Sequence, residues 1–306
     1  MNRLLASLLA ALALAVAPQA PAATQHHPKP LPTALKPAPA AVRPALWVVR
    51  DKDTTIYLFG TVHALPKGVA WYDGKPASAF ESADTLVTEI IEKSPEEMRP
   101  VVKAKAMLPE GQSLRDLLAP ARRKAFEAAL AANGLPVAAF DRYQPWYAAV
   151  ALSTLPVLRG GFDPANGVDS TLSEKAKAAG RAHEALETAE YQLGLFASLP
   201  LAVQQRYLAE VVKNLPKVTV ELGNIIQAWE VGNAARLARL MNADEDDPSL
   251  RAALLINRNK AWARWVRTRL GKPGVVFVAV GAGHLAGPGS VQDQLGKLGI
   301  RATRVQ

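Results

Sequence analysis

The sequence predicts an α/β protein built on a central, mainly parallel sheet with helical insertions. Two continuous apolar runs, residues 54–60 and 274–280, are typical of strands buried on both faces, as found in parallel sheets. Each run closes on a Gly-x-x-His motif, which ends at His63 or at His284. Because ligands of such sheets bind beyond the carboxyl ends of the strands, we expect the two histidines to meet at one edge.

The amino terminus carries a targeting signal. Residues 1–22 contain a short positive region, an apolar core and a small-residue cleavage site, which predict a cleaved signal peptide. Residues 23–44 are rich in Pro and Ala and predict a disordered linker, in which the pair His26-His27 is interpreted as incidental. We therefore expect an exported protein, periplasmic or secreted. No later segment is long and apolar enough to span a bilayer, so no stable membrane insertion is expected.

Composition narrows the classes of function. The chain has no cysteine, which excludes disulfides, thiolate metal sites and a cysteine nucleophile. Its formal net charge is +9, and the four cations of residues 1–44 leave +5 (9 − 4) for residues 45–306. The basic residues are spread along predicted helices, so we expect no nucleic-acid partner. Oligomeric state is left open.

The folded domain is expected at residues 45–306, with helical insertions at about 95–158 and 189–270. It begins with a predicted β-hairpin, in which residues 45–50 and 54–60 flank the turn Asp51-Lys52-Asp53. Trp71 is interpreted as an aromatic cap of the core.

A short helix around residues 76–83 and a third strand at 85–91 follow the hairpin. Glu89 lies among the apolar residues of that strand and needs a partner if it is buried. Ser94 and Glu97 then form a predicted capping box, with Pro95 at the first helical position. They open the first helical insertion, which we expect to cover or narrow the site.

Residues 160–169 form a predicted loop in which Asp169 caps a helix over 170–179. Gly180 ends this helix, and residues 181–187 are expected to form a fourth strand that closes on Glu187. His183 lies early in this strand, away from the ligand edge, and is interpreted as structural.

The last third is mainly helical. Helices are expected over 189–213, 219–230, 248–270 and 291–298, with a final strand over 300–305. The acidic loop 244–247 lacks the spacing of a calcium loop, and Asp247 is interpreted as a helix cap. Arg258 lies on the apolar stripe of its helix, and two arrangements are possible. Either its aliphatic part packs along the core while the guanidinium reaches water, or the guanidinium points into the site.

Two histidines and one or two carboxylates at neighbouring strand ends predict a divalent-metal site for Zn, Mn, Co or Fe. A metal with an open coordination position activates water for hydrolysis. The alternative is that both histidines hydrogen-bond to loop carbonyls and hold the sheet edge together. A Ser/His/Asp triad is disfavoured, because no Gly-x-Ser-x-Gly motif occurs.

Six segments resemble the TraB/GumN family in sequence and in order. They are LFGTVH (58–63), TEI (88–90), FDPANGVDSTL (162–172), ALETAEYQL (185–193), RN (258–259) and VFVAVGAGHLAGPGSV (276–291). That family includes the TraB and PrgY pheromone-shutdown proteins, GumN proteins and the TIKI ectodomains. The resemblance covers residues 45–305 and implies an α/β core like that of erythromycin esterase, a haem-binding lipoprotein family and the TIKI proteins.

The resemblance also implies an activity and the residues that carry it. The TIKI branch implies divalent-metal-dependent proteolysis of a secreted peptide. The family's functional positions fall on His63, Glu89, Glu187, Arg258, Asn259 and His284. At position 191 many relatives carry an acidic residue, whereas this chain has Tyr191.

Together these observations predict an exported metallohydrolase, with a peptide as the expected substrate. His63, His284 and Glu89 are the expected ligands of a divalent metal (Mn, Co, Zn or Fe). Glu187 is expected to act as a ligand or base, and Arg258, beside Asn259, to stabilise an oxyanion or a substrate carboxylate. The alternative is a non-catalytic protein that sequesters a peptide, haem or a polysaccharide precursor; a vestigial accessory protein is a third possibility, against which the intact motifs argue.

Overall fold

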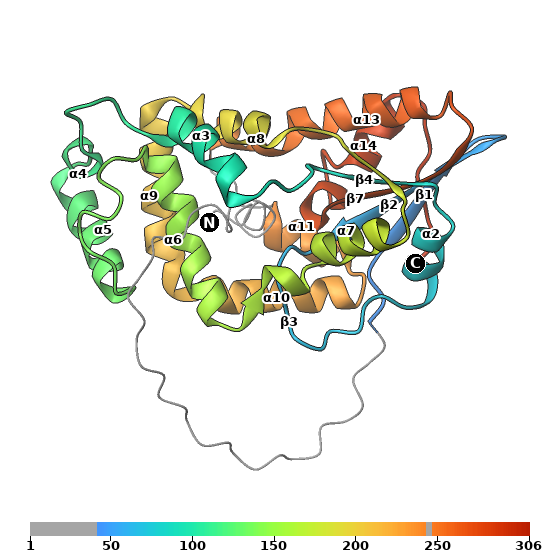
Figure 1. Cartoon of the computed structure of the whole chain (residues 1–306), viewed down its shortest axis with the longest axis horizontal. Coiled ribbons are helices and arrows are strands. Elements are labelled where there is room, and N and C mark those ends of the chain that lie inside the picture. Colours follow the sequence, from blue (N-terminus) through green and yellow to red (C-terminus); the bar gives the residue numbers. More distant parts are fainter. Residues whose placement is uncertain (1–41, 243–246) are drawn as a thin grey trace, which may run out of the picture.

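The computed structural model describes residues 42–242 and 247–306 (Figure 1). The predicted signal peptide, nearly all of the predicted linker and three residues of the acidic loop lie outside this described part. Within it, no helix is long and apolar enough to cross a membrane.

The core is a six-stranded sheet in the order β6-β4-β7-β2-β1-β8. Its strands are β1 (Leu46–Arg50), β2 (Thr54–Thr61), β4 (Thr85–Thr88), β6 (Ala182–Ala185), β7 (Gly274–Gly281) and β8 (Thr303–Arg304), and a separate two-stranded sheet pairs β3 (Leu65–Pro66) with β5 (Phe162–Asp163). The four strands from β6 to β2 are parallel, whereas β1 and β8 are antiparallel to their neighbours. The predicted α/β class with a mainly parallel sheet is confirmed; the likeness to a particular esterase or TIKI core stays a prediction.

Helices make up most of the remaining chain. They are α2 (Gly74–Glu81), α3 (Pro95–Ala106), α4 (Leu114–Leu117), α5 (Pro120–Ala132), α6 (Pro145–Arg159), α7 (Val168–Ala178), α8 (Ala189–Ala197), α9 (Leu201–Asn214), α10 (Val218–Glu230), α11 (Ala234–Met241), α12 (Pro248–Arg251), α13 (Asn257–Arg269) and α14 (Val291–Lys297), with short turns η1 (Pro164–Asn166), η2 (Leu215–Lys217), η3 (Ala252–Ile256) and η4 (Ala282–Leu285). The turn η3 has π-helical hydrogen bonding and joins α12 to α13.

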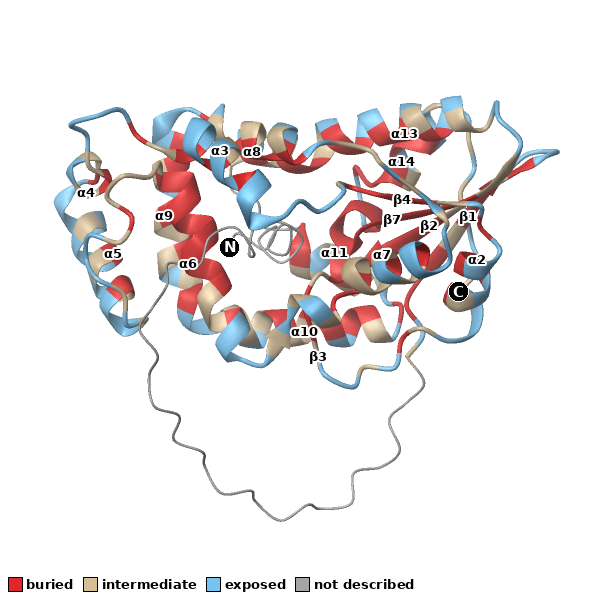
Figure 2. Ribbon diagram, viewed as in Figure 1, coloured by how far each residue is buried: buried red, intermediate tan, exposed pale blue. Residues whose placement is uncertain are grey.

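Both faces of the sheet are covered, as its apolar strands predict (Figures 1 and 2). Side chains alternate along a strand, so Val276, Val278 and Val280 of β7 pack with residues of α13 and α14. Phe277 and Ala279 lie in the larger core on the opposite face, which includes residues of α2 and α7. This three-layer arrangement explains why the strand has a continuous apolar run.

The register brings the strand ends together. In the β2/β7 pair, Gly60 lies opposite Val280 and Thr61 lies opposite Gly281. In the β4/β7 pair, Thr88 lies opposite Ala279, which leaves Glu89 one residue beyond the end of β4. The two Gly-x-x-His motifs and Glu89 therefore leave adjacent parallel strands at the same edge.

Several local predictions are confirmed. Ser94 and Glu97 form the predicted capping box of α3, and Asp247 accepts hydrogen bonds at the start of α12. Gly180 follows α7 with a φ of 62°, a conformation that favours glycine. Trp71 is buried and stacks on Phe59.

Other local predictions are wrong. Asp169 is not the N-cap of α7, because this helix begins at Val168 after Gly167 and places Asp169 in its first turn. Strands β4 and β6 end at Thr88 and Ala185, short of the predicted ends at residues 91 and 187. Glu89 and Glu187 thus lie just past their strands, where backbone pairing continues through the hydrogen bond from the Glu187 N–H to the Glu89 carbonyl.

Candidate functional site

Close backbone packing fixes the two Gly-x-x-His turns. A Cβ atom at Gly60 would lie 3.0 Å from the Cα of Ala282, so a side chain there would force the two turns apart. A Cβ atom at Gly167 would lie 2.1 Å from the His63 carbonyl oxygen. Glycine is needed at both positions because the backbones approach so closely.

Arg258 of α13 lies at the centre of a buried ionic cluster at this edge. Its side chain is 0% exposed. The guanidinium donates from Nε and Nη2 to the Glu187 carboxylate, and from Nη2 to Glu89 Oε2 at 2.5 Å. Its Nη1 donates to the Leu254 carbonyl at 3.2 Å and to His284 Nε2 at 3.1 Å. All five N–H groups of the guanidinium therefore have acceptors.

Both carboxylates of the cluster accept hydrogen bonds on each oxygen. Glu89 Oε1 accepts from the Gly281 N–H at 2.8 Å, and Glu187 Oε1 accepts from the Trp262 indole at 3.0 Å. Burial by itself raises the pKa of Glu89, but the Arg258 guanidinium, together with His284, His63 and the Gly281 N–H, outweighs burial and lowers the pKa to about 2. With two carboxylates and one guanidinium, the cluster carries one more negative than positive charge.

Gln192 of α8 bridges the two carboxylates. Its Nε2 donates to Glu89 Oε2 at 3.1 Å and to Glu187 Oε2 at 3.0 Å, and its side chain is buried. Sequence reasoning missed this role and that of Trp262. A glutamine five residues after Glu187 is a weak sequence signal, which becomes meaningful only once the strand ends are known to converge.

His284 lies inside this cluster and is 1% exposed. Its Nδ1 donates to Asn259 Oδ1 at 2.6 Å, and Asn259 in turn donates to the Gly289 carbonyl at 2.8 Å. Its Nε2 accepts from Arg258, so the ring is a neutral imidazole protonated at Nδ1. Burial, followed by the charge of Arg258, lowers the pKa of His284 to about 3. The Trp262 ring lies over the imidazole, with 4.4 Å between ring centroids.

His63 has different surroundings. Its Nδ1 lies 2.7 Å from Asp169 Oδ2, and the side chains of His63 and Asp169 are 10% and 17% exposed. Thr61 donates to the other oxygen of Asp169 at 2.9 Å and fixes that carboxylate. Because the carboxylate accepts, Nδ1 carries the proton and the lone pair lies on Nε2. A histidine held in this way can take a proton from water or a nucleophile.

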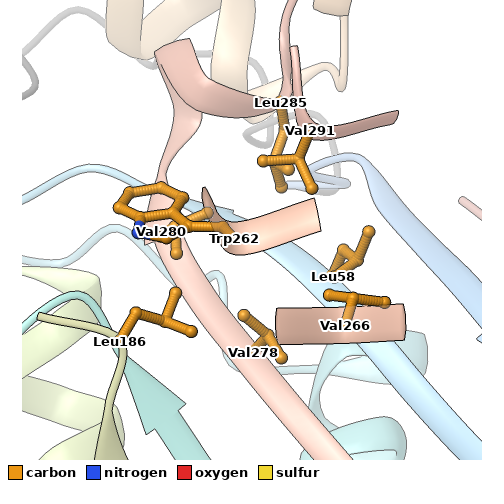
Figure 3. Close-up of a pocket in the computed structure, with 8 residues that line it drawn as sticks. All are labelled: Leu58, Leu186, Trp262, Val266, Val278, Val280, Leu285 and Val291. Carbon is orange, nitrogen blue, oxygen red and sulfur yellow. The ribbon is translucent and has the colours of Figure 1, made fainter. Parts of the chain in front are cut away.

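A small apolar pocket lies behind the ionic cluster, between α13 and the sheet (Figure 3). Its lining residues are Leu58, Leu186, Trp262, Val266, Val278, Val280, Leu285 and Val291. Trp262 belongs to both, because its ring lines the pocket while its indole N–H bonds to Glu187. The apolar wall keeps water away from the carboxylates and strengthens their interaction with Arg258.

The structure thus brings together every residue that the sequence singled out at this edge. Of the two alternatives for Arg258, the guanidinium points into the site. His183, predicted to be structural, hydrogen-bonds with the Thr88 hydroxyl at 2.8 Å. The predicted roles of Glu187 as base and of Arg258 as oxyanion donor stay predictions, and the fully used guanidinium favours a role in holding the carboxylates.

The predicted metal ligands do not fit a metal as their side chains lie. Glu89 Oε2 and His284 Nε2 both face the guanidinium of Arg258, and the other Glu89 oxygen accepts from a backbone N–H. Across residues 42–242 and 247–306, no three His, Asp or Glu side chains are grouped as ligands. Metal binding by His63, His284 and Glu89 stays a prediction, and it requires Arg258 to withdraw.

Comparisons with known proteins assign the chain to a family. An uncharacterized protein of Treponema pallidum (strain Nichols) is 22% identical over 267 residues, which are 82% of this chain and 80% of the relative. No solved structure matches. The model of the TraB/PrgY/gumN family matches residues 45–304, which is most of the chain and confirms the resemblance seen in the motifs. The chain belongs to the TraB/PrgY/gumN family.

Proposed function

We propose that this protein is a hydrolase in which His63, held by Asp169, activates water at the carboxyl ends of β2, β4 and β7. The observation that carries the proposal is the 2.7 Å contact between His63 Nδ1 and Asp169 Oδ2, at a histidine that keeps some exposure to solvent. An anchored imidazole is the usual general base, because its unperturbed pKa is close to neutral pH.

The ionic cluster supports this role by holding the floor of the site. Arg258, Glu89 and Glu187 join residues of α13 to the ends of β4 and β6, and His284 fixes one side of the guanidinium. These contacts keep neighbouring strand ends in one geometry, as a catalytic site requires. The base itself is held by Asp169.

Export and a peptide substrate are further parts of the proposal, and metal dependence is an alternative to the role of His63 as base. Export follows from the signal-peptide pattern of residues 1–22, and the peptide substrate and the metal follow from the likeness to the TIKI branch. A metal held by His63, His284 and Glu89 is an alternative to the role of His63 as base, because an imidazole nitrogen that binds a metal has no lone pair left to accept a proton. A bound metal would supply an activated water.

The test is a peptide-library cleavage assay on untagged residues 23–306, with and without added Mn, Co, Zn or Fe. The parent protein is compared with His63→Gln and with His183→Gln, a matched histidine away from the proposed base. We expect cleavage by the parent and by His183→Gln, and none by folded His63→Gln. Cleavage that persists in His63→Gln contradicts the proposal, and tight peptide binding without cleavage favours a sequestering protein.

Metal dependence has its own readout. Mass spectrometry of the untagged protein, beside the His63→Gln/His284→Gln double variant, measures the bound metal. Near-stoichiometric metal in the parent, lost in the folded double variant, supports metal binding by these histidines. Cleavage that needs no added metal and survives chelators rules out metal dependence. It leaves the proposed role of His63 as base in place.

A further inference from the structure

One segment of the domain carries an excess of positive charge. Residues 251–272 contain seven Lys and Arg residues and no Asp or Glu. Because residues 45–306 carry a formal charge of +5, the rest of that domain carries −2 (5 − 7). The excess positive charge of the folded domain therefore comes from the segment that contains α13.

Three of these cations share the outer face of α13. Lys260, Arg264 and Arg267 follow each other at spacings of four and three residues, which places them on one stripe of a helix. All three are exposed, as are Asn257 and Thr268 beside them. Figure 2 shows the exposed outer side of α13 along the edge of the molecule. No ion pair with a described residue involves any of the three cations.

We infer that this stripe docks the protein on an anionic phospholipid surface. Charge complementarity is the argument, since exposed cations at helical spacing, none of which pairs with a described carboxylate, match a layer of phosphate headgroups. Trp265 flanks the stripe and is half-buried, as suits a residue at the boundary between apolar and polar surroundings.

The packing of α13 determines whether docking is electrostatic or involves insertion into the bilayer. Its apolar residues, including Trp262, Ala263 and Val266, are buried in the core, so α13 has no free apolar face to insert into a bilayer. The contact is therefore electrostatic and reversible, and it weakens with salt. Docking leaves the inner face of α13 in place, where Arg258 and Trp262 hold the site. The inference does not depend on the proposed hydrolase activity.

The test is co-sedimentation of the mature chain, residues 23–306, with vesicles. Vesicles of phosphatidylglycerol and phosphatidylethanolamine are compared with vesicles of phosphatidylcholine alone. The triple variant Lys260→Ser/Arg264→Ser/Arg267→Ser removes the stripe. The matched control Lys103→Ser/Arg122→Ser/Lys124→Ser removes the same charge from exposed positions of α3 and α5; α5 lies at the end of the molecule far from α13, and α3 lies beside α8 (Figure 1).

We expect the parent and the control to bind anionic vesicles at low salt and to release them at roughly 0.5 M salt. The stripe variant should bind about 100-fold more weakly, because each cation near an anionic surface contributes roughly fivefold. Circular dichroism verifies that it is folded. An equal loss in both triple variants, no binding of the parent to anionic vesicles, or stronger binding to an oligonucleotide in a competition would each overturn the inference.

Discussion

The two Gly-x-x-His motifs have the same spacing and leave neighbouring strands, yet their histidines have opposite surroundings. His284 is 1% exposed and lies within the Arg258 cluster as a neutral hydrogen-bond acceptor. The His63 side chain is 10% exposed and hydrogen-bonds to Asp169. One histidine thus belongs to the buried carboxylate cluster, and the other is the base of the proposed hydrolase. The difference shows that equal motifs need not carry equal chemistry.

The largest expected effect tests the exposed histidine. In the proposed hydrolase, His63→Gln should lower the rate of peptide cleavage by about 10²–10⁴-fold, because proton transfer to a positioned base contributes that much. Its free energy of unfolding should change by less than about 1 kcal/mol, as at other partly exposed positions. The two readouts are the initial rate with a peptide found in the screen and urea unfolding followed by circular dichroism.

Asp169→Asn is the matched change beside it. The amide keeps the size of the side chain but removes the charge that holds the Nδ1 proton of His63, so the rate should fall by a smaller factor. A rate unchanged in Asp169→Asn would mean that His63 works without its carboxylate and would weaken the comparison between the motifs.

The second expected effect tests the buried cluster. Arg258→Met should lower the free energy of unfolding by about 3–5 kcal/mol, because it leaves two carboxylates buried without their cation. Arg264→Met on the exposed face of the same helix is the control and should change it by less than about 0.5 kcal/mol. Similar values for the two variants, measured by urea unfolding, would show that the cluster does not stabilise the fold.

The third expected effect is the pH dependence of stability that His284 contributes. Its folded pKa of about 3 lies below the usual 6.5, so the unfolded chain binds more protons between these values. Stability should therefore fall as pH drops from 6.5 towards 3, by about 2 kcal/mol between pH 6.5 and 4.5. Glu89 acts in the same direction at lower pH, since its stabilisation is lost as pH falls from 4.5 through about 2.

Urea unfolding at pH 7, 5.5 and 4.5 measures this effect. Burial also lowers the pKa of His183, so the contribution of His284 is the difference between the parent and His284→Gln. The variant should be less stable at pH 7 and should lose less stability on acidification. Parallel pH profiles for the two proteins would show that His284 is not buried as a neutral ring.

Much of the fold follows from sequence patterns that depend on neighbouring residues only. The apolar runs of β2 and β7 and the capping box of α3 are local, and the structure confirms them. The ends of β4 and β6 were misplaced because Glu89 and Glu187 continue the backbone pairing after the regular strands end. A sequence pattern does not distinguish a residue inside a regular strand from one that continues the backbone pairing just after it.

The site was only partly predictable for a related reason. Glycine followed by histidine at two strand ends indicates a shared edge, but it does not tell which histidine is buried. The sequence pattern predicts Asp169 as a helix cap, because a carboxylate at a helix start usually accepts hydrogen bonds from the backbone beside it. Its contacts with Thr61 and His63 join residues more than 100 positions apart, and only the folded chain shows them.

The smallest expected effect concerns Gln192, the residue that the sequence did not reveal. Gln192→Met keeps the length of the side chain but removes the donor shared by Glu89 and Glu187, so the free energy of unfolding should fall by about 1 kcal/mol. Gln227→Met, an exposed position on α10, is the control.

The Gln192 variant also sharpens the comparison between the motifs. Because Gln192 belongs to the buried cluster, its loss should be non-additive with Arg258→Met, whereas it should add independently to His63→Gln. Urea unfolding of the three single variants and the two double variants measures both couplings. A coupling energy with His63 as large as the one with Arg258 would mean that the two histidines share one network, and the separation of floor and base would then fail.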